Sequence, residues 1–472
     1  MYLLYITLLF FISSCTVGPD FHRPTPPTVQ HYTRENIESQ STDGVHFVYN
    51  KPLPKQWWQL FNSKAINDLI TEALAHNQTL AAAYATVTQA QQNLNAVAGT
   101  QLPQVGLNAA VTPQQFAPAI YGFGQFPTTA FVLYTASVNV SYNLDLFGAL
   151  KRQVEAYGAL VKYQAYQFQG ASLTLVTNVT NIVFKLALLN AQITNTRAII
   201  AAQESLLSIA RKQFLTGGIA KIDVNTIEKT LLQTKASLPD LEKSLDQTKN
   251  LLAVYLGKIP SEVKINDFKL DDFKPLQEIP LILPSTLARQ RPDILASEAL
   301  LHQANAQVGV ATANMYPQFN ITASGGPIAA QNTWQSLSGQ SWIWSIGPAM
   351  TLPIFSGGTL TAQKKAAIAG FEIALANYKQ TVLQGLQNVA DCLSALKQDS
   401  KALIFQEKYY AAANENLLIT QKQYKAGGVS LSQLLNSQIL FNQALINKEQ
   451  ARSLKLTDTV ALFQALGGGW WQ

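Results

Sequence analysis

Residues 213–219 read Gln-Phe-Leu-Thr-Gly-Gly-Ile, and residues 423–429 read Gln-Tyr-Lys-Ala-Gly-Gly-Val. The two stretches are 210 positions apart (423 − 213), and Leu256-Gly257 returns at Leu466-Gly467 with the same offset. The register therefore holds across the whole of residues 150–257 without a net insertion or deletion. A repeat of this kind predicts two copies of one structural unit.

The repeated unit reads as a long helical hairpin. Residues 148–214 contain no proline, and apolar residues recur there with a 3-4 spacing that is close to a heptad. Gly217-Gly218 then breaks the helix, because glycine adopts positive φ without steric cost. A second helical run returns from about Lys221 to Leu256. We predict roughly 65 residues in one direction and 36 back, on the order of 100 Å and 54 Å.

The sequence period changes from helical to alternating after Leu102-Pro103. Apolar residues alternate with small, almost entirely uncharged polar ones, and the pattern returns in the second half at an offset of 214 (317 − 103). We predict two β-hairpins, at about residues 103–147 and 317–355, with strands of about ten residues around a loop that runs to about Ala130. Each half thus reads short helix, hairpin, long helix and return helix.

The four predicted strands have two explanations, a small soluble sheet packed on helices or strands that cross a membrane. The neutral polar face, the strand length and an aromatic pair at Trp342 and Trp344 favour the membrane. Open sheet edges are not tolerated in lipid, and four strands are too few to close a barrel, so several chains must share one. On this interpretation Asn139, Asn143 and Asn320 face the lumen.

Composition argues against several other functions. Charged residues make up only 13% of the 472 residues, and the net charge of +6 is spread along the chain, which does not favour nucleic-acid binding. The five histidines have no metal-ligand spacing and no phosphate-binding glycine loop is present, so we predict neither an enzyme nor a cofactor. The S-x-x-K match at Ser394–Lys397 lies within a helical heptad and is best explained by chance.

The N-terminus reads as a secretion signal followed by a lipidated cysteine. A short apolar run from Leu3 to Ile12 is followed by Ser13-Ser14-Cys15, which is similar to a bacterial lipobox. Residues 1–5 contain no Lys or Arg, which departs from the usual basic start. A chance cysteine after a signal peptide is the alternative.

Several motifs taken together resemble one family, the lipoprotein branch of TolC-type outer-membrane efflux channels, also called NodT-like. The motifs are Cys15–Phe21 with Pro24, Trp57-Trp58 with Phe61, Leu144–Gly148, Leu283–Ser285, Arg291–Ile294, Pro353–Gly358 and Ala465–Trp470. The resemblance implies a fold that is mainly α with β. In a trimer, twelve strands would form a barrel that continues into a tunnel of twelve long antiparallel helices.

The resemblance also implies a place and a set of partners. The chain would be the exit duct of a tripartite efflux pump in the outer membrane of a Gram-negative bacterium, anchored by lipid on Cys15. It would work with a periplasmic adaptor protein and an inner-membrane transporter that we expect to be proton-driven. The expected segments are a signal peptide (1–14), a lipidated tether and equatorial segment (15–62), a first repeat (63–257), an equatorial connector (258–284), a second repeat (285–467) and a tail (468–472).

By resemblance, the helical turns at Gly217-Gly218 and Gly427-Gly428 dock the adaptor. Some relatives carry an acidic residue just after the second turn, whereas here Val429 is followed by Ser430. One interpretation is a basic periplasmic aperture that favours anions, and the other is an ordinary solvated turn. The candidate aperture residues are Lys221, Asp223, Lys425 and Ser430.

Two rival functions share most of these features. The duct could serve a type I protein secretion system, or the chain could be a structural periplasmic lipoprotein without a pore. The exported substrate, whether drug, metal ion or other small solute, is not specified by any residue pattern.

Overall fold

The computed structural model describes residues 16–34, 46–49, 51, 53–117, 122, 128–273, 276, 278–330 and 341–470. The predicted signal peptide and the predicted lipidation site Cys15 lie outside these residues. The chain divides into two compact units. The first holds the described residues of 1–24, 86–164 and 297–378, and the second holds those of 25–85, 165–296 and 379–472.

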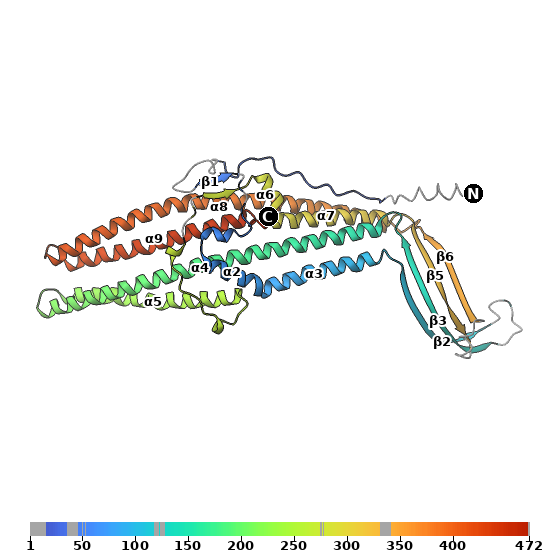
Figure 1. Ribbon diagram of the computed structural model, residues 1–472, viewed down its shortest axis with the longest axis horizontal. Coiled ribbons are helices and arrows are strands. Elements are labelled where there is room, and N and C mark those ends of the chain that lie inside the picture. The colour runs from blue at the N-terminus through green and yellow to red at the C-terminus, as the bar shows by residue number, and fades with distance from the viewer. Residues whose placement is uncertain are drawn as a thin grey trace. The chain divides into compact units, whose positions relative to one another are not determined.

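Four long helices carry the repeat. Helices α4 (Ala149–Leu215) and α8 (Thr359–Lys425) have 67 residues each, and α5 (Lys221–Tyr255) and α9 (Leu431–Ala465) have 35 each. All four boundaries differ by 210 between the copies (359 − 149, 425 − 215, 431 − 221 and 465 − 255). Figure 1 shows α5 beside α4 and α9 beside α8 as antiparallel pairs. Salt bridges such as Arg197–Glu242 (2.7 Å) and Arg211–Glu228 (3.0 Å) link α4 to α5, so the predicted helical hairpins are confirmed.

A shorter pair of helices precedes each hairpin. These helices are α2 (Lys64–His76), α3 (Gln78–Gly99), α6 (Pro284–Gln290) and α7 (Pro292–Ala313). The side-chain oxygen of Asn77 accepts a hydrogen bond from the Leu80 amide at 3.0 Å and so caps the start of α3.

The strands form one antiparallel sheet in the first unit. Its order is β2 (Gln104–Phe116), β3 (Thr129–Leu144), β5 (Gln318–Ala329) and β6 (Trp342–Thr351), as Figure 1 shows. The predicted strands of about ten residues were too short, because β2 has 13 residues and continues through Pro113 to Phe116, and β3 has 16. The loop ends at Thr129, close to the predicted Ala130. Pro113 is tolerated because β2 is an edge strand, where a missing backbone N–H need not break a ladder on both sides.

A small second sheet corrects the predicted tether and connector. Strand β1 (His46–Tyr49) pairs in parallel with β4 (Glu278–Leu281), with Phe47 opposite Ile279. The sequence interpretation treated both segments as irregular. Ile279 and Leu281 are almost fully buried, so these two segments contribute to the core of the second unit.

Aromatic side chains hold this core together. Trp57, in a short 3-10 helix (Trp57–Phe61), is fully buried and lies 5.4 Å from the Phe463 ring, measured between ring centroids. Phe184 of α4 lies 5.2 Å from Phe61 and 5.0 Å from Phe273. Residues 57–61 therefore anchor this core.

Candidate functional site

The four-stranded sheet has one apolar and one polar face. Val105 lies opposite Val140, whereas Asn143 lies opposite Asn320 and Asn139 opposite Ser324. Because neighbouring residues on a strand point to opposite faces, these pairs place most of the apolar residues together on one face. The apolar face comprises Val105, Leu107, Val111, Val138, Val140, Tyr142, Leu144, Phe319, Ile321, Trp342, Trp344, Ile346 and Met350.

Much of the apolar face is left uncovered by the residues that the structure describes. Leu107 is 77% exposed and Trp344 is 79% exposed, and they belong to one continuous sheet face. A contiguous exposed apolar surface of this size marks contact with a membrane or another protein. The face is therefore suited to lipid.

The opposite face carries no charged side chain in the described strands, and its polar members are mostly short, although Phe131, Leu133 and Ile343 also lie on it. Ser324 and Ser345 share a hydrogen bond of 2.9 Å between their hydroxyls, and the Asn139 amide donates to the Ser137 hydroxyl at 3.1 Å. The three asparagines predicted to face a lumen, Asn139, Asn143 and Asn320, all lie on this face.

The two helical turns have the same geometry. Gly217 has φ +76° and Gly427 has φ +77°, which are left-handed values that favour glycine. The amides of Gly218 and Gly428 donate to the carbonyls five residues earlier, at 2.8 and 2.9 Å. This is a Schellman ending, which satisfies the last helical carbonyls and reverses the chain.

The turns of the two repeats lie together. The side chain of Gln213 donates to the Tyr424 hydroxyl at 3.2 Å, and Val224, Leu417 and Leu431 share one buried apolar cluster. A small pocket lies between the turns and is lined by Ile219, Asp223, Thr226, Ile227, Ser430, Leu431, Ser432 and Leu435.

Three of the four candidate aperture residues have local structural roles. Asp223 accepts a hydrogen bond from the Ala220 amide at 3.2 Å, and the Ser430 hydroxyl accepts one from the Gln433 amide at 3.2 Å. Both therefore cap the return helices. The Lys221 ammonium lies 5.6 Å from the centre of the Phe214 ring. Lys425 is the last residue of α8.

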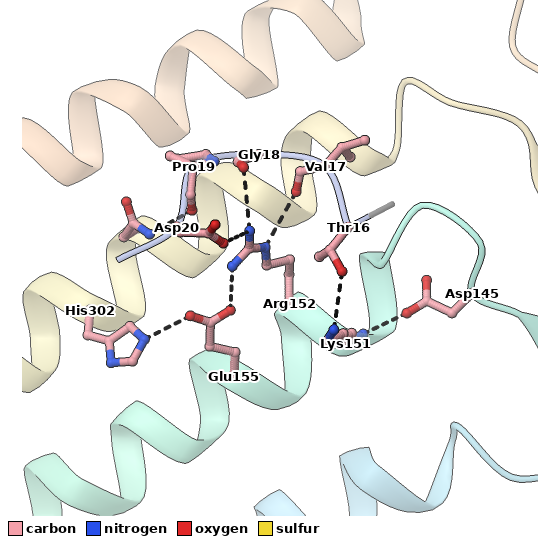
Figure 2. Close-up of polar contacts among 11 residues, drawn as sticks. Thr16, Val17, Gly18, Pro19, Asp20, Asp145, Lys151, Arg152, Glu155 and His302 are labelled. Atoms are coloured by element: carbon pink, nitrogen blue, oxygen red, sulfur yellow. Dashed lines mark hydrogen bonds and ion pairs between the residues drawn. The ribbon is translucent and has the colours of Figure 1, made fainter. Parts of the chain in front are cut away.

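A third candidate site surrounds Arg152 at the start of α4 (Figure 2). Arg152 is only 4% exposed. Its guanidinium donates to the Val17 carbonyl (3.4 Å), the Gly18 carbonyl (3.4 Å), Asp20 (2.7 Å) and Glu155 (2.8 Å). Three of these four partners belong to the N-terminal segment.

Helix α7 completes this site. The Glu155 carboxylate lies 2.8 Å from the His302 ring nitrogen, and the Phe21 ring stacks on His302 with 4.2 Å between centroids. The Asn305 amide donates to the Pro19 carbonyl at 2.9 Å. The N-terminal segment therefore contacts both α4 and α7. We call Val17–Asp20 with Arg152 and Glu155 the N-terminal clamp.

Two glycines allow this close approach. A Cβ atom on Gly309 would lie 2.8 Å from Cγ of Arg152, and one on Gly18 would lie 2.5 Å from Cα of Gly309. Gly18 also has φ +94°, which other residues rarely adopt. A side chain at position 18 would therefore meet the backbone of α7, and one at position 309 would meet the side chain of Arg152.

The charges of the clamp stabilise one another. The hydrogen bond and the charge of Arg152 lower the pKa of Asp20. Burial would raise the pKa of Glu155, but hydrogen bonds from Arg152 and His302 leave it lowered. Burial likewise disfavours the Arg152 cation, yet Glu155 and Asp20 leave its pKa raised. All three groups are therefore ionised at neutral pH.

The sequence predicts neither Arg152 nor Glu155 as site residues. The Arg152 side chain meets Val17–Asp20, and the Glu155 side chain meets His302, each across more than a hundred residues of sequence, and a separation of that size leaves no local pattern. The usable signal is an Arg and a Glu three positions apart at the start of an otherwise weakly charged helix.

Comparisons with known proteins identify the chain's relatives. It is 26% identical over 467 residues to the cation efflux system protein CusC of Escherichia coli O6:H1, covering 98% of this chain and 97% of CusC. It is 27% identical over 475 residues to the probable outer membrane lipoprotein SilC of Salmonella typhimurium, covering 99% and 98%. The structure of the outer-membrane channel OprN superimposes with a TM-score of 0.88 at 25% identity, covering 97% of this chain and 100% of that one.

The pattern of one protein family, described as outer membrane efflux protein, matches two parts of the chain. These are residues 69–258 and 283–468, so each match covers one copy of the repeat. The chain therefore belongs to the outer membrane efflux protein family.

Proposed function

We propose that this outer membrane efflux protein works as a homotrimeric exit duct of a tripartite pump. The duct passively exports small toxic compounds that an inner-membrane transporter and a periplasmic adaptor deliver. The single observation that carries the proposal is the four-stranded sheet, which has an apolar face, a polar face and two open edges. Among the residues that the structure describes, β2 and β6 each pair on one side only.

The repeat supplies the register in which these edges would meet. Strand β6 is equivalent to β3 at an offset of 210 (351 − 141), and β2 is equivalent to β5 at an offset of 214 (318 − 104). Within one chain, β3 pairs with β5 so that Leu144 lies opposite Phe319. The equivalent pair between two chains is Ile354 of one copy opposite Val105 of the next.

The exposure of these residues supports this pairing. Ile354 is 92% exposed and Val105 is 69% exposed, although both are apolar. The same register sets Leu352 opposite Leu107 and keeps the apolar face continuous across the boundary. Three copies would then give twelve strands, a closed ring with no free edge.

Cross-linking tests the ring. Ile354→Cys with Val105→Cys is expected to give covalent dimers and trimers on oxidation in outer-membrane vesicles, whereas either single variant stays at monomer size. Leu144→Cys with Phe319→Cys is the matched control, because this pair forms within one chain and leaves the size unchanged. Efficient cross-linking of Ile354→Cys to Leu107→Cys instead, or no cross-linking at all, would contradict the proposed register.

The exposed ends of the helical hairpins support docking of the adaptor at the turns Gly217-Gly218 and Gly427-Gly428. Leu215 is 82% exposed and Ile222 is 71% exposed, so apolar surface is available there. The lipid anchor on Cys15 is supported by the lipobox-like sequence and by similarity to SilC, which is described as a probable lipoprotein.

Two measurements separate the rival functions. Deletion of the gene is expected to increase sensitivity to some members of a panel of antibiotics, metal ions and solvents. Loss of a secreted protein with unchanged sensitivity would favour a protein-secretion duct. Absence of conductance in planar bilayers would favour a spacer without a pore.

A further inference from the structure

The N-terminal clamp is a binding site that is incomplete without the segment it holds. Arg152 is almost fully buried, and three of its four hydrogen-bond partners come from Val17, Gly18 and Asp20. Without the segment, Glu155 would be the one partner left of these four, and water would have to replace the others. The docked segment therefore supplies most of the hydrogen bonds of a charge that is buried when the segment is in place.

The repeat shows that the clamp is an addition to the fold. At the 210-residue offset, Arg152 corresponds to Ala362 and Glu155 to Lys365, although the helices have the same boundaries in both copies. A helix at this place in the fold thus does not require the Arg–Glu pair. The pair is present only where the N-terminal segment crosses from α4 to α7.

The clamp also fixes where the N-terminus meets the sheet. The Val17 amide donates to the Phe147 carbonyl at 3.1 Å, in the corner between the end of β3 at Leu144 and the start of α4 at Ala149. Cys15 precedes Val17 by two residues in the sequence. The segment that follows the cysteine is therefore held beside the end of β3.

From this geometry we infer that the clamp is an anchor-positioning site, which holds the lipid-bearing N-terminus at the periplasmic end of β3. The acyl chains then enter the inner leaflet directly beside the barrel and not at the end of a loose tether. The partner of the site is thus the chain's own N-terminal segment, and through it the lipid leaflet. The inference rests on the proposed barrel and lipid anchor.

Chymotrypsin cleavage after Phe21 tests the clamp in the full-length protein in outer-membrane vesicles. Phe21 stacks on His302 when the segment is docked, so cleavage requires local opening, and its rate follows the open population. Arg152→Gln is expected to raise the rate at least tenfold. Asp20→Asn removes one partner whose side chain is 82% exposed, so the fold should tolerate it, and a rise of several-fold is expected.

The matched control is Arg197→Gln, which breaks an exposed salt bridge to Glu242 in the second unit. Its cleavage rate after Phe21 should equal that of the wild type. If Arg152 only stabilised the fold, the cleavage rate after Phe21 would rise only in proportion to a fall in the unfolding temperature. If Arg152 holds the segment, the cleavage rate should rise by more than the change in unfolding temperature accounts for. Equal rates in the wild type, Arg152→Gln and Asp20→Asn would overturn the inference.

Two further measurements distinguish a failure of the clamp from a failure of the proposed function. The mass of the released fragment, which ends at Phe21, reports whether Cys15 carries lipid. The cross-link between residues 354 and 105 reports the barrel. Slow cleavage that releases a fragment without lipid would contradict the lipid anchor but not the docking of the segment. Fast cleavage of a lipidated wild-type protein would contradict the clamp and leave the lipid anchor standing.

Discussion

Single residues in this protein are informative because charge is scarce. Only 13% of residues are charged, so a buried Arg152 with two carboxylate partners stands out once its surroundings are known. The sequence predicts residues whose role depends on near neighbours, such as the turn glycines at 217 and 427. It does not predict the clamp, because Asp20 and Arg152 meet only after folding.

Cysteine labelling tests the two sheet faces at this scale. Asn139→Cys and Asn143→Cys are expected to react with a water-soluble maleimide, because their face lines the proposed lumen. Val140→Cys and Leu144→Cys should react only with lipid-phase probes. Intact mass spectrometry measures the modified fraction, and reversed accessibility would mean that the two faces are exchanged.

The native Cys392 does not interfere with this experiment. Burial, together with the nearby carboxylates of Asp458 and Asp391, raises the pKa of its thiol to about 11. The thiolate is the reactive form, so at pH 7.5 Cys392 should remain unmodified in the folded protein and become labelled in denaturant.

At the scale of elements, the sequence predicts the helices better than the strands. The 210-residue offset and a helical period over long segments give the boundaries of α4, α5, α8 and α9 to within a residue or two. Strands β1 and β4 are missed because each has four residues and their pairing spans more than two hundred positions. A segment of four residues is too short to show the alternation of apolar and polar residues that indicates a strand.

The pairing of α8 with α9 should depend on pH through Asp458. Burial and a hydrogen bond with Asp399 raise the pKa of Asp458 to about 7 from its ordinary 3.8. A raised pKa means that the fold favours the protonated form, so its contribution to stability is full below pH 4 and is lost as pH rises through about 7. Asp458→Asn cannot ionise and should not show this loss.

Thermal unfolding followed by circular dichroism checks this prediction. The unfolding temperature of Asp458→Asn should exceed that of the wild type at pH 8, and the gain should be smaller at pH 5. Asp240→Asn is the control, because Lys243 lowers the pKa of that exposed carboxylate and no gain at pH 8 is expected. An equal shift at both pH values would argue against the Asp399–Asp458 pair as its cause.

At the scale of the whole molecule, the protein is an outer-membrane efflux protein whose two family matches coincide with its two repeats. The mainly helical fold with four strands in one sheet confirms the fold class predicted from the sequence. Closure of the barrel could be inferred only from the number of strands, because the sequence of one chain has no pattern that shows which strands pair between chains.

Ion selectivity is the prediction that belongs to the assembled channel. Basic residues gather near the helical turns, at Arg211, Lys212, Lys221, Lys422 and Lys425. If they border the aperture, channels reconstituted in planar bilayers should prefer anions, and Lys425→Glu should abolish that preference. Lys243→Glu, on α5 and more than twenty residues from the turn, is the control. An unchanged reversal potential in Lys425→Glu would contradict the basic aperture and favour the alternative that the turns are ordinary solvated turns.

The single N-terminal clamp makes neighbouring helix junctions unequal. The proposed ring of three chains would contain six such junctions, three inside the chains and three between them. Only those inside would carry a buried arginine that holds a third segment across them. The proposed assembly would then alternate reinforced and plain junctions, and any widening of this part of the ring would begin at the plain ones, where one subunit meets the next.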